Sequence, residues 1–414
     1  MAVTQDAAAI AGDIARLRHA IHAEPEVGLH LPLTQRKILA ALDGLPLEVT
    51  VGTALSSVTA VLRGGAVQGD GEGGTGRRAG GGPAVLLRAD MDALPVTERT
   101  GLDYASTIDG TMHACGHDLH SAMLAGAARL LSDRQADLPG TVVFMFQPGE
   151  EGHGGAKLMI EEGVLDAAGG RAAAAYALHV ASAELPAGMF SSREGPMMAA
   201  AEALDITVHG RGGHGSQPQH AADPIPAACE IVTALQVLVT RAFDIFDPVV
   251  ITVGSFHAGT TNNVIPDDAR LQVTIRSFSA AARTRVREAA VRVVYNIVAA
   301  HGLTATAEFT GSYPVTVNDQ QEARFAAQVV TDVLGGDRFR PQANPLAGAE
   351  DFSFVLDRVP GAFIMLGACP PAVDPDTAPF NHSALAVFDD MVLADGAALY
   401  TELAVRRLNR KSGR

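Results

Sequence analysis

Six side chains that could bind a metal ion or move a proton are spread over this 414-residue chain. They are Cys115, His117, Glu150, Glu151, His179 and His382. A thiolate, imidazoles and carboxylates are ligands that suit a borderline divalent cation such as Zn²⁺, Mn²⁺, Co²⁺ or Ni²⁺. A second carboxylate beside a ligand carboxylate indicates a base that acts on metal-bound water. The residue types therefore predict a metal site that activates water.

Cys115 and His117 stand two positions apart in the segment Met-His-Ala-Cys-Gly-His-Asp. A glycine-containing loop ahead of a helix can aim both side chains at one point, and the start of the helix stabilises a thiolate. We therefore predict that both residues bind metal. The neighbouring His113 and His120 are expected to support the ligands or to lie on the surface.

Glu150 and Glu151 follow an apolar run and a Pro-Gly pair. Because neighbouring side chains diverge, one can bind metal while the other faces the water. We assign Glu151 to the metal and Glu150 to proton transfer, although chemistry alone leaves this order open. The five predicted ligands exceed the needs of one Zn²⁺ with an open position, so we expect a pair of ions. These ligands are Cys115, His117, Glu151, His179 and His382.

Two further carboxylates, Asp90 and Asp92, follow another apolar run. They could be ligands, or they could orient a ligand histidine by hydrogen bonding. We favour the orienting role.

Three polar residues in the middle of the chain are candidates for contact with substrate. His214 stands in a glycine-rich turn at residues 210–216. It is either an exposed hairpin residue or part of a mobile arm that brings an imidazole to a developing oxyanion. Asn263 and Arg276 could bind a carboxylate, since arginine offers a two-pronged fork, although a surface ion pair is the default for an isolated arginine on a strand. From the residues alone, both alternatives stay open for His214 and for Arg276.

Apolar runs that alternate with helical patterns predict a parallel, buried sheet. We expect strands at residues 58–63, 83–88, 141–146 and 173–178, and helices at 6–23, 119–132 and 155–162. Ligands gather at the carboxyl ends of such strands, and Asp90, Glu150 and His179 are each expected just past a strand end.

A second pattern, strand–helix–strand–strand–helix–strand over residues 203–309, is typical of a ferredoxin-like sandwich. We expect its helices at 224–242 and 280–300. The predicted fold is therefore an α/β catalytic metal-binding domain with an inserted α+β lid and dimerisation domain. Because His382 lies near the end of the chain, the catalytic domain is expected to comprise residues 1–187 and 310–414, and the lid residues 188–309.

Charge and composition argue against several classes of partner. A net charge of −15 disfavours binding to nucleic acid or to anionic lipid. No stretch is expected to reach the roughly 20 apolar residues that span a bilayer. Three cysteines do not make a disulfide framework and favour the cytoplasm. The glycine-rich residues 64–82 indicate a hairpin tip rather than a phosphate-binding loop, since no Gly-Lys-Ser/Thr follows.

Taken together, the chain resembles the metal-dependent amidohydrolases that include hippurate hydrolases, N-acyl-amino-acid amidohydrolases and the plant auxin–amino-acid conjugate hydrolases. The match covers nearly the whole chain, and it includes the segments 18–26, 88–96, 112–118, 146–152, 177–180, 210–218, 263–266, 348–352 and 381–383. The resemblance implies a co-catalytic dinuclear metallopeptidase fold, with the five ligands named above and Glu150 as general acid and base. It also implies that His214, Asn263 and Arg276 bind substrate, with one or more of them reaching across a dimer interface. We therefore predict that all three bind substrate and that His214 is also catalytic.

The expected activity is hydrolysis of the amide bond of N-acyl amino acids, such as hippurate or acetyl-amino acids. Two divalent ions per subunit are expected, Mn²⁺ or Zn²⁺, with Co²⁺ or Ni²⁺ as further candidates, in a homodimer or homotetramer. A dipeptidase or aminopeptidase is the alternative, and it would need an acidic pocket for a free amine. A non-catalytic ligand-binding relative is disfavoured, because Glu150 and all five ligands are intact.

Overall fold

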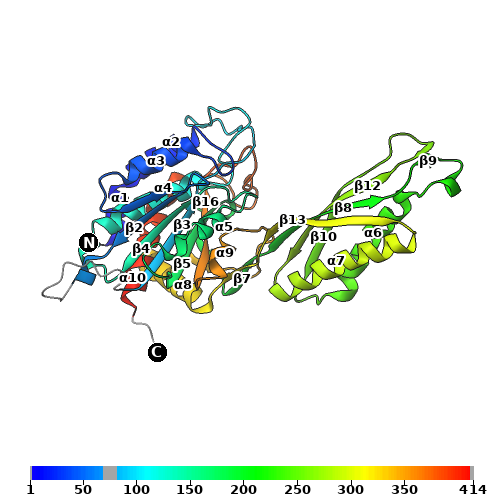
Figure 1. Cartoon of the computed structure of the whole chain (residues 1–414). Helices are drawn as coiled ribbons and strands as arrows, with labels where there is room; N and C mark the ends of the chain where they lie inside the picture. The colour runs from blue at the N-terminus through cyan, green and yellow to red at the C-terminus, as the bar shows by residue number, and fades with distance from the viewer. Residues whose placement is uncertain (1, 69–81, 411–414) are drawn as a thin grey trace. The chain divides into compact units, whose positions relative to one another are not determined.

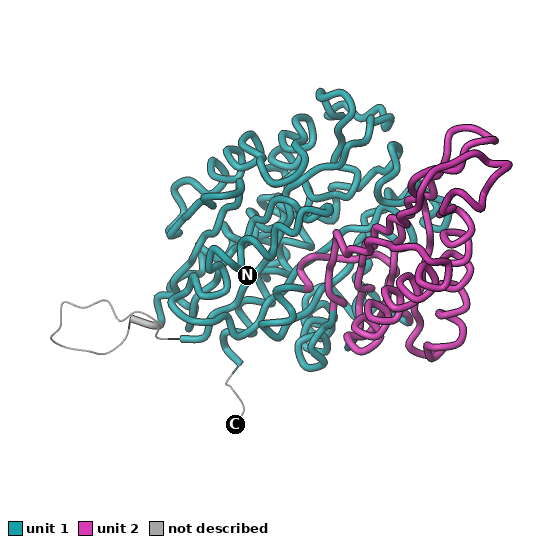
Figure 2. The backbone as a smooth tube through the Cα atoms, turned by 45° about the vertical axis from the view of Figure 1, so that its right-hand side comes forward, with its two compact units in different colours: residues 1–195, 317–343, 354–414 teal, residues 196–316, 344–353 magenta. Residues whose placement is uncertain are grey.

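The computed structural model describes residues 2–68 and 82–410, which form two compact units (Figures 1 and 2). The first unit comprises residues 1–195, 317–343 and 354–414, and the second comprises 196–316 and 344–353. The second unit begins and ends a few residues later than the predicted lid. It also includes residues 344–353, which the prediction places in the catalytic domain. Most of the glycine-rich stretch, residues 69–81, lies outside the described residues.

Within the described part of the chain, the first unit is built on an eight-stranded sheet in the order β1-β2-β4-β3-β5-β16-β6-β15. The strands are β1 (Glu48–Val51), β2 (Val58–Arg63), β3 (Ala84–Asp90), β4 (Thr141–Gln147), β5 (Ala174–Pro186), β6 (Phe190–Ser192), β15 (Phe339–Pro341) and β16 (Gly361–Cys369). The prediction of a parallel sheet is right for the centre, where β4, β3, β5 and β16 run parallel. β1 and β2 precede the alternating pattern and pair in antiparallel fashion, since a short connection joins them. The expected hairpin across residues 64–82 is wrong, because β2 pairs with β4 and not with β3.

The helices of the first unit are α1 (Val3–Ala9), α2 (Ala11–His22), α3 (Pro32–Leu42), α4 (His117–Ser132), α5 (Gly155–Glu161), α8 (Gln320–Leu334) and α10 (Leu393–Asn409), with the short α9 (Ser353–Leu356) at a boundary between the units. The single helix predicted at 6–23 is wrong, because the backbone leaves the helical region at Ile10 (φ −102°, ψ 2°) and divides it into α1 and α2.

Small residues allow close packing of α4 and α10, which both lie against β3 (Figure 1). A Cβ atom at Gly396 of α10 would lie 2.0 Å from the sulfur of Met123 on α4, so a larger residue there would require the Met123 side chain to move. The central strands are buried on both faces, and all seven residues of β3 are buried. One face, which carries Val85 and Leu87, belongs to a large apolar core that also contains residues of α4 and α10.

The strand that carries His179 is longer than the sequence pattern indicates. β5 continues to Pro186, and His179 lies inside it, opposite Met365 of β16. The prediction that His179 follows a strand end is therefore wrong. β16 supplies the partner that extends the strand, and no local pattern reveals a partner so distant in the sequence.

The second unit has the predicted order of elements: β8 (Ala200–His209), α6 (Pro224–Ala242), β10 (Val249–Ala258), β12 (Asp268–Ser277), α7 (Ala280–Ala300) and β13 (Thr304–Tyr313). In the described residues its four-stranded antiparallel sheet has the order β10-β12-β8-β13, which is that of a ferredoxin-like sandwich. A small ribbon joins β9 (Gly213–His214) to β11 (Val264–Ile265). The chain crosses between the units through β7 (Gly195–Met198) and β14 (Thr316–Asn318).

Among the described helices, α6 is long and apolar enough to cross a membrane by length and composition alone, although we expect no such stretch from the sequence. Its Ala227, Ala228, Ile231 and Leu235 are buried in the core of the second unit. The side chain of Asp223 also caps its first turn, accepting a hydrogen bond from the backbone N–H of Ile225. These are features of a helix in a folded domain, so its composition is weak evidence for a membrane span.

Candidate metal centre

The loop ahead of α4 places Cys115 and His117 beside β5. Between them, Gly116 has φ 82°, and a Cβ atom there would lie 2.3 Å from Cγ2 of Val180. Only glycine fits this left-handed turn so close to β5. His117 is the first residue of α4, and Cys115 lies just outside the helix start.

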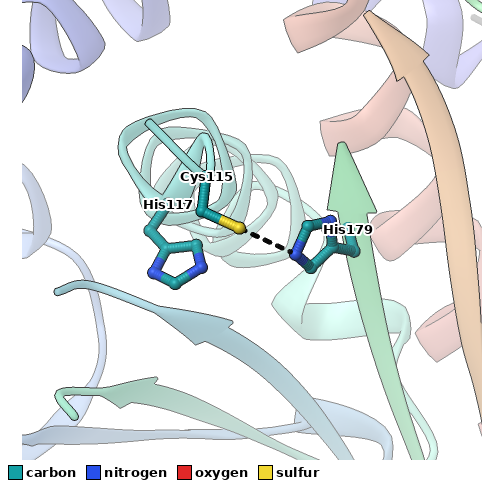
Figure 3. Close-up of side chains that lie close together, drawn as sticks. All are labelled: Cys115, His117 and His179. Carbon is teal, nitrogen blue, oxygen red and sulfur yellow. Dashed lines mark hydrogen bonds between the residues drawn. The ribbon is translucent and has the colours of Figure 1, made fainter. Parts of the chain in front are cut away.

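Cys115 lies between two predicted histidine ligands. Its sulfur is 3.5 Å from Nε2 of His179 and 3.3 Å from Nε2 of His382. Figure 3 shows the thiol pointing from the start of α4 toward His179 on β5. Nε2 of His382 is also 3.1 Å from the Glu151 carboxylate. Segments far apart in the sequence thus bring sulfur, nitrogen and oxygen donors together.

Hydrogen bonds fix which ring nitrogen of two histidines can bind a metal. Nδ1 of His117 donates to the carbonyl oxygen of Asp92 at 2.8 Å, and Nδ1 of His179 donates to the carbonyl oxygen of Val180 at 2.9 Å. Each proton therefore sits on Nδ1, which leaves a lone pair on Nε2. Nε2 of His117 is buried and has no hydrogen-bond partner among the described residues. This is the arrangement expected of a histidine prepared for a cation.

The donor atoms of the predicted residues form one connected cluster in the first unit. Within each of three groups the donor atoms lie within 4.8 Å of one another. The groups are Cys115–His117–His179, Cys115–Glu151–His382 and His117–Glu150–Glu151. Because the groups share members, all five predicted ligands and Glu150 are brought together. The five ligands alone, one thiolate, three imidazoles and one carboxylate, are too many donors for one ion with an open position and suit two.

The Asp92 carboxylate fixes the backbone of the two glutamates. Its carboxylate oxygens accept hydrogen bonds from the backbone N–H groups of Glu150 and Glu151, both at 3.0 Å. With both oxygens occupied and its carbonyl bound to His117, Asp92 has the geometry of an orienting residue. Glu150 is buried, with 7% of its surface exposed, so its carboxylate works in a shielded environment.

The part of the cluster around His382 stabilises positive charge. Hydrogen bonds and the charges of Cys115 and Glu151 raise the pKa of His382 to about 10. Burial favours the neutral acid at Glu151, but contact with His382 and the charge of His117 together hold its pKa below the usual value. His382 also has a left-handed backbone, φ 73°, which costs a non-glycine residue on the order of 1 kcal/mol or more. Such strain is typical of functional positions.

Comparison with known proteins agrees with this geometry. The profile of peptidase family M20/M25/M40 matches residues 86–406. The chain belongs to peptidase family M20/M25/M40. It is 37% identical to an IAA-amino acid hydrolase, ILR1-like 4, of Arabidopsis thaliana, over 95% of this chain and 85% of that protein. It is 32% identical to the hippurate hydrolase of Campylobacter jejuni, over 96% of this chain and 97% of that one. A Bacillus subtilis structure described as a dinuclear metal-binding peptidase of the M20 family is 32% identical, with a TM-score of 0.79, over 97% of this chain and 99% of that chain.

The predicted substrate-binding residues of this M20 chain lie in the second unit at two separate places. His214 pairs with Val264 in the β9–β11 ribbon, and the backbone N–H of Gly215 donates to the carbonyl oxygen of Asn263 at 2.8 Å. Arg276 lies near the far end of β12, roughly 25 Å along the strand from the ribbon at about 3.3 Å per residue. It donates to Thr274 Oγ1 at 2.7 Å, and burial lowers its pKa. His214 and Asn263 are thus brought together, and Arg276 is not brought to them.

Two residues that support the cluster, Asn381 and Tyr400, were not singled out from the sequence. Asn381 donates to the carbonyl oxygen of Val180 at 3.0 Å and accepts from the N–H of Ser182 at 2.9 Å, which anchors the turn before His382. Tyr400 and His120 accept hydrogen bonds from the backbone N–H groups on either side of His179. His113 and His120 are both fully buried, so the surface role that the sequence allowed for them is wrong. An asparagine next to a ligand histidine is a usable signal in the sequence; the role of Tyr400 has none.

The first segment of the M20 resemblance, residues 18–26, supplies two side chains of a buried ionic network around Asp118 of α4. His22 lies 2.9 Å from the Asp118 carboxylate through Nδ1 and 3.3 Å from that of Glu98 through Nε2. Arg18 donates to Asp118 at 3.0 Å. Burial disfavours the charged imidazole, but Asp118 and Glu98 outweigh burial and raise the pKa of His22 to about 9. His22 is therefore protonated at neutral pH.

This network predicts a pH dependence of stability. Because the pKa of His22 rises from 6.5 in the unfolded chain to about 9 in the folded one, its stabilisation is complete below pH 6.5 and is lost as the pH rises through about 9. The shift corresponds to about 3 kcal/mol. We expect the difference in unfolding free energy between the parent and His22→Gln to shrink by that order from pH 6 to pH 10, measured by chemical denaturation. His30→Gln, at an exposed position, is the control. A difference that does not change with pH would contradict the assignment.

Proposed function

We propose that this M20 protein hydrolyses the amide bond of N-acyl amino acids, giving a carboxylic acid and a free amino acid. The observation that carries the proposal is the connected cluster of Cys115, His117, Glu151, His179 and His382 with the Glu150 carboxylate at its edge. The names of the relatives support the choice of substrate, since one is an IAA-amino acid hydrolase and another a hippurate hydrolase.

The five donors fit two divalent ions, and the mixture of sulfur, nitrogen and oxygen favours Zn²⁺ or Mn²⁺, with Co²⁺ and Ni²⁺ as further candidates. Bound there, two such ions would acidify water and polarise the amide carbonyl. Glu150 takes the proton of the attacking water and then delivers it to the leaving nitrogen. Its backbone is fixed by Asp92, so the carboxylate is held ready for both transfers.

Substrate recognition is assigned to the second unit. Arg276 offers a guanidinium fork to the substrate carboxylate, Asn263 adds an amide, and His214 stabilises the oxyanion. Because Arg276 lies roughly 25 Å along β12 from the ribbon, one small substrate cannot touch all three residues of the same chain. We therefore propose a homodimer, or a homotetramer made of such dimers, in which the ribbon of one chain completes the site of its partner. The described cysteines are free thiols, which supports a cytoplasmic location.

The second candidate function is a dipeptidase or aminopeptidase, which the description of the Bacillus subtilis structure as a peptidase favours. Such a substrate carries a free amine, and a carboxylate would have to bind it.

The two functions are separated by one assay. Protein freed of metal by a chelator and reloaded with Mn²⁺ or Zn²⁺ is tested on hippurate, acetyl-amino acids, dipeptides and hippuramide, which lacks the carboxylate. We expect hydrolysis of hippurate or acetyl-amino acids only after reloading, with hippuramide a poor substrate. Preference for dipeptides would establish the second candidate. Metal-loaded protein that cleaves none of these amides would refute both.

A further inference from the structure

The ladder between β3 and β5 ends before either strand does. The two strands pair in parallel from Val85 opposite Ala174 to Arg88 opposite Ala177. β3 continues to Asp90, and β5 continues far beyond Ala177. Backbone groups that leave a ladder inside a protein need other partners, because an unpaired buried group costs about 1–3 kcal/mol. The partners found here are side chains.

The first of these side chains is Tyr400 of α10. Its hydroxyl donates to the carbonyl oxygen of Arg88 at 2.6 Å and accepts from the N–H of Leu178 at 2.8 Å. One hydroxyl group thus bridges β3 and β5 at the position where the next direct ladder bond would form. Tyr400 is fully buried, so this bridge holds the strands at a fixed separation.

The second side chain is His120 of α4. Its Nε2 accepts from the N–H of Val180 at 2.8 Å, so the proton lies on Nδ1, which donates to the Asp90 carboxylate at 2.5 Å. Asp90 is also paired with Arg88 at 2.6 Å. With one nitrogen accepting and the other donating, His120 has no lone pair left for a cation, although it lies close to Asp90 and His117. It links α4, β3 and β5 instead.

These two bridges enclose the backbone of His179. Tyr400 holds the N–H of Leu178, and His120 holds the N–H of Val180, on either side of it. His120 also lies one turn after His117 on the same face of α4, so its attachment fixes the first turn of that helix. The directions of His117 and His179 are therefore set by the same pair of contacts.

We propose that Tyr400 and His120 are positioning residues that hold β3 and β5 apart and so set the separation of His117, Cys115 and His179 for metal binding. This inference rests on the proposed function, because it needs those residues to be ligands. It assigns no metal-bound atom to either positioning residue.

The test compares three variants that each alter one buried polar group. Tyr400→Phe removes the first bridge, and His120→Gln replaces the imidazole, whose two nitrogens contact Val180 and Asp90 at once, with an amide. Tyr176→Phe is the matched control, since Tyr176 lies on β5, is fully buried and bonds to Glu322 instead of the β3–β5 gap. Titration of metal-free protein with Co²⁺ gives the number of ions bound, the Kd and the absorption spectrum. The melting temperature of the metal-free protein is measured alongside.

We expect the parent and Tyr176→Phe to bind Co²⁺ alike. Tyr400→Phe and His120→Gln should bind the same number of ions with a Kd about 10- to 100-fold higher and with a changed spectrum. If His120→Gln binds one ion fewer, His120 is a ligand and the inference is wrong. If both variants bind Co²⁺ as the parent does, the contacts are structural only and the inference is wrong. The same conclusion follows if their affinity for Co²⁺ falls no more than that of Tyr176→Phe at an equal loss of melting temperature. A parent that binds no Co²⁺ would instead overturn the proposed function.

Discussion

Replacing Glu150 with glutamine is expected to lower kcat for an N-acyl amino acid by about 10³-fold, the middle of the range for loss of a general acid and base. Glutamine has the same shape but cannot take the proton of the attacking water. The backbone N–H of residue 150 still donates to Asp92, so the local structure should persist. Metal content, measured by elemental analysis, should equal that of the parent.

The matched control for this substitution is Glu161→Gln, at an exposed position at the end of α5. It makes the same change of charge a short distance along the chain and should leave kcat unchanged. Full activity of the Glu150→Gln enzyme would exclude its role in proton transfer. A loss of activity that is matched by a loss of metal would instead make Glu150 a ligand, and it would reverse the order assigned to the glutamate pair.

Replacing Cys115 with serine should have the second large effect, on metal binding itself. Its sulfur belongs to two of the donor groups, the one with His117 and His179 and the one with Glu151 and His382. Loss of this donor therefore weakens both parts of the cluster. We expect the variant to lose at least one of two Co²⁺ ions at concentrations that fill the parent. The thiolate-to-Co²⁺ absorption in the near ultraviolet should disappear, and hydrolysis should fall with the metal.

Cys229→Ser provides the control, because Cys229 is an exposed free thiol on α6 in the second unit. It should keep the parent's stoichiometry and spectrum. Retention of two ions and of the thiolate band in Cys115→Ser would show that Cys115 is not a ligand, and the two-ion arrangement would need another donor.

The sequence predicts the helices and strands that are stabilised mainly by residues close together in the chain. The helices at 224–242 and 280–300 match α6 and α7, because each has a capping side chain, Asp223 or Ser279, ahead of a long apolar stripe. The predicted bounds are wrong where an element is extended by pairing with a segment far away in the sequence. β5 is longer than predicted since β16, nearly two hundred residues later, pairs with it.

The candidate site is also only partly predictable from the sequence. Residue types and spacing predict the donors, because thiolates and imidazoles beside carboxylates are rare outside metal sites. Sequence cannot predict that Nε2 of His117 is the ring nitrogen without a hydrogen-bond partner among the described residues, since this depends on the hydrogen bond from Nδ1 to the carbonyl of Asp92. It also cannot predict the bridge from Tyr400, because its partners are backbone atoms of residues 88 and 178, which have no side-chain signature.

The placement of β16 has a consequence for biosynthesis. In the sheet it lies between β5 and β6, both of which leave the ribosome long before it, and His382 emerges later still. A nascent chain can complete the antiparallel sandwich of residues 196–316 while the larger sheet still lacks an inner strand. Prematurely terminated products therefore cannot assemble the full set of donors, and they leave apolar strand surface open to quality-control proteases.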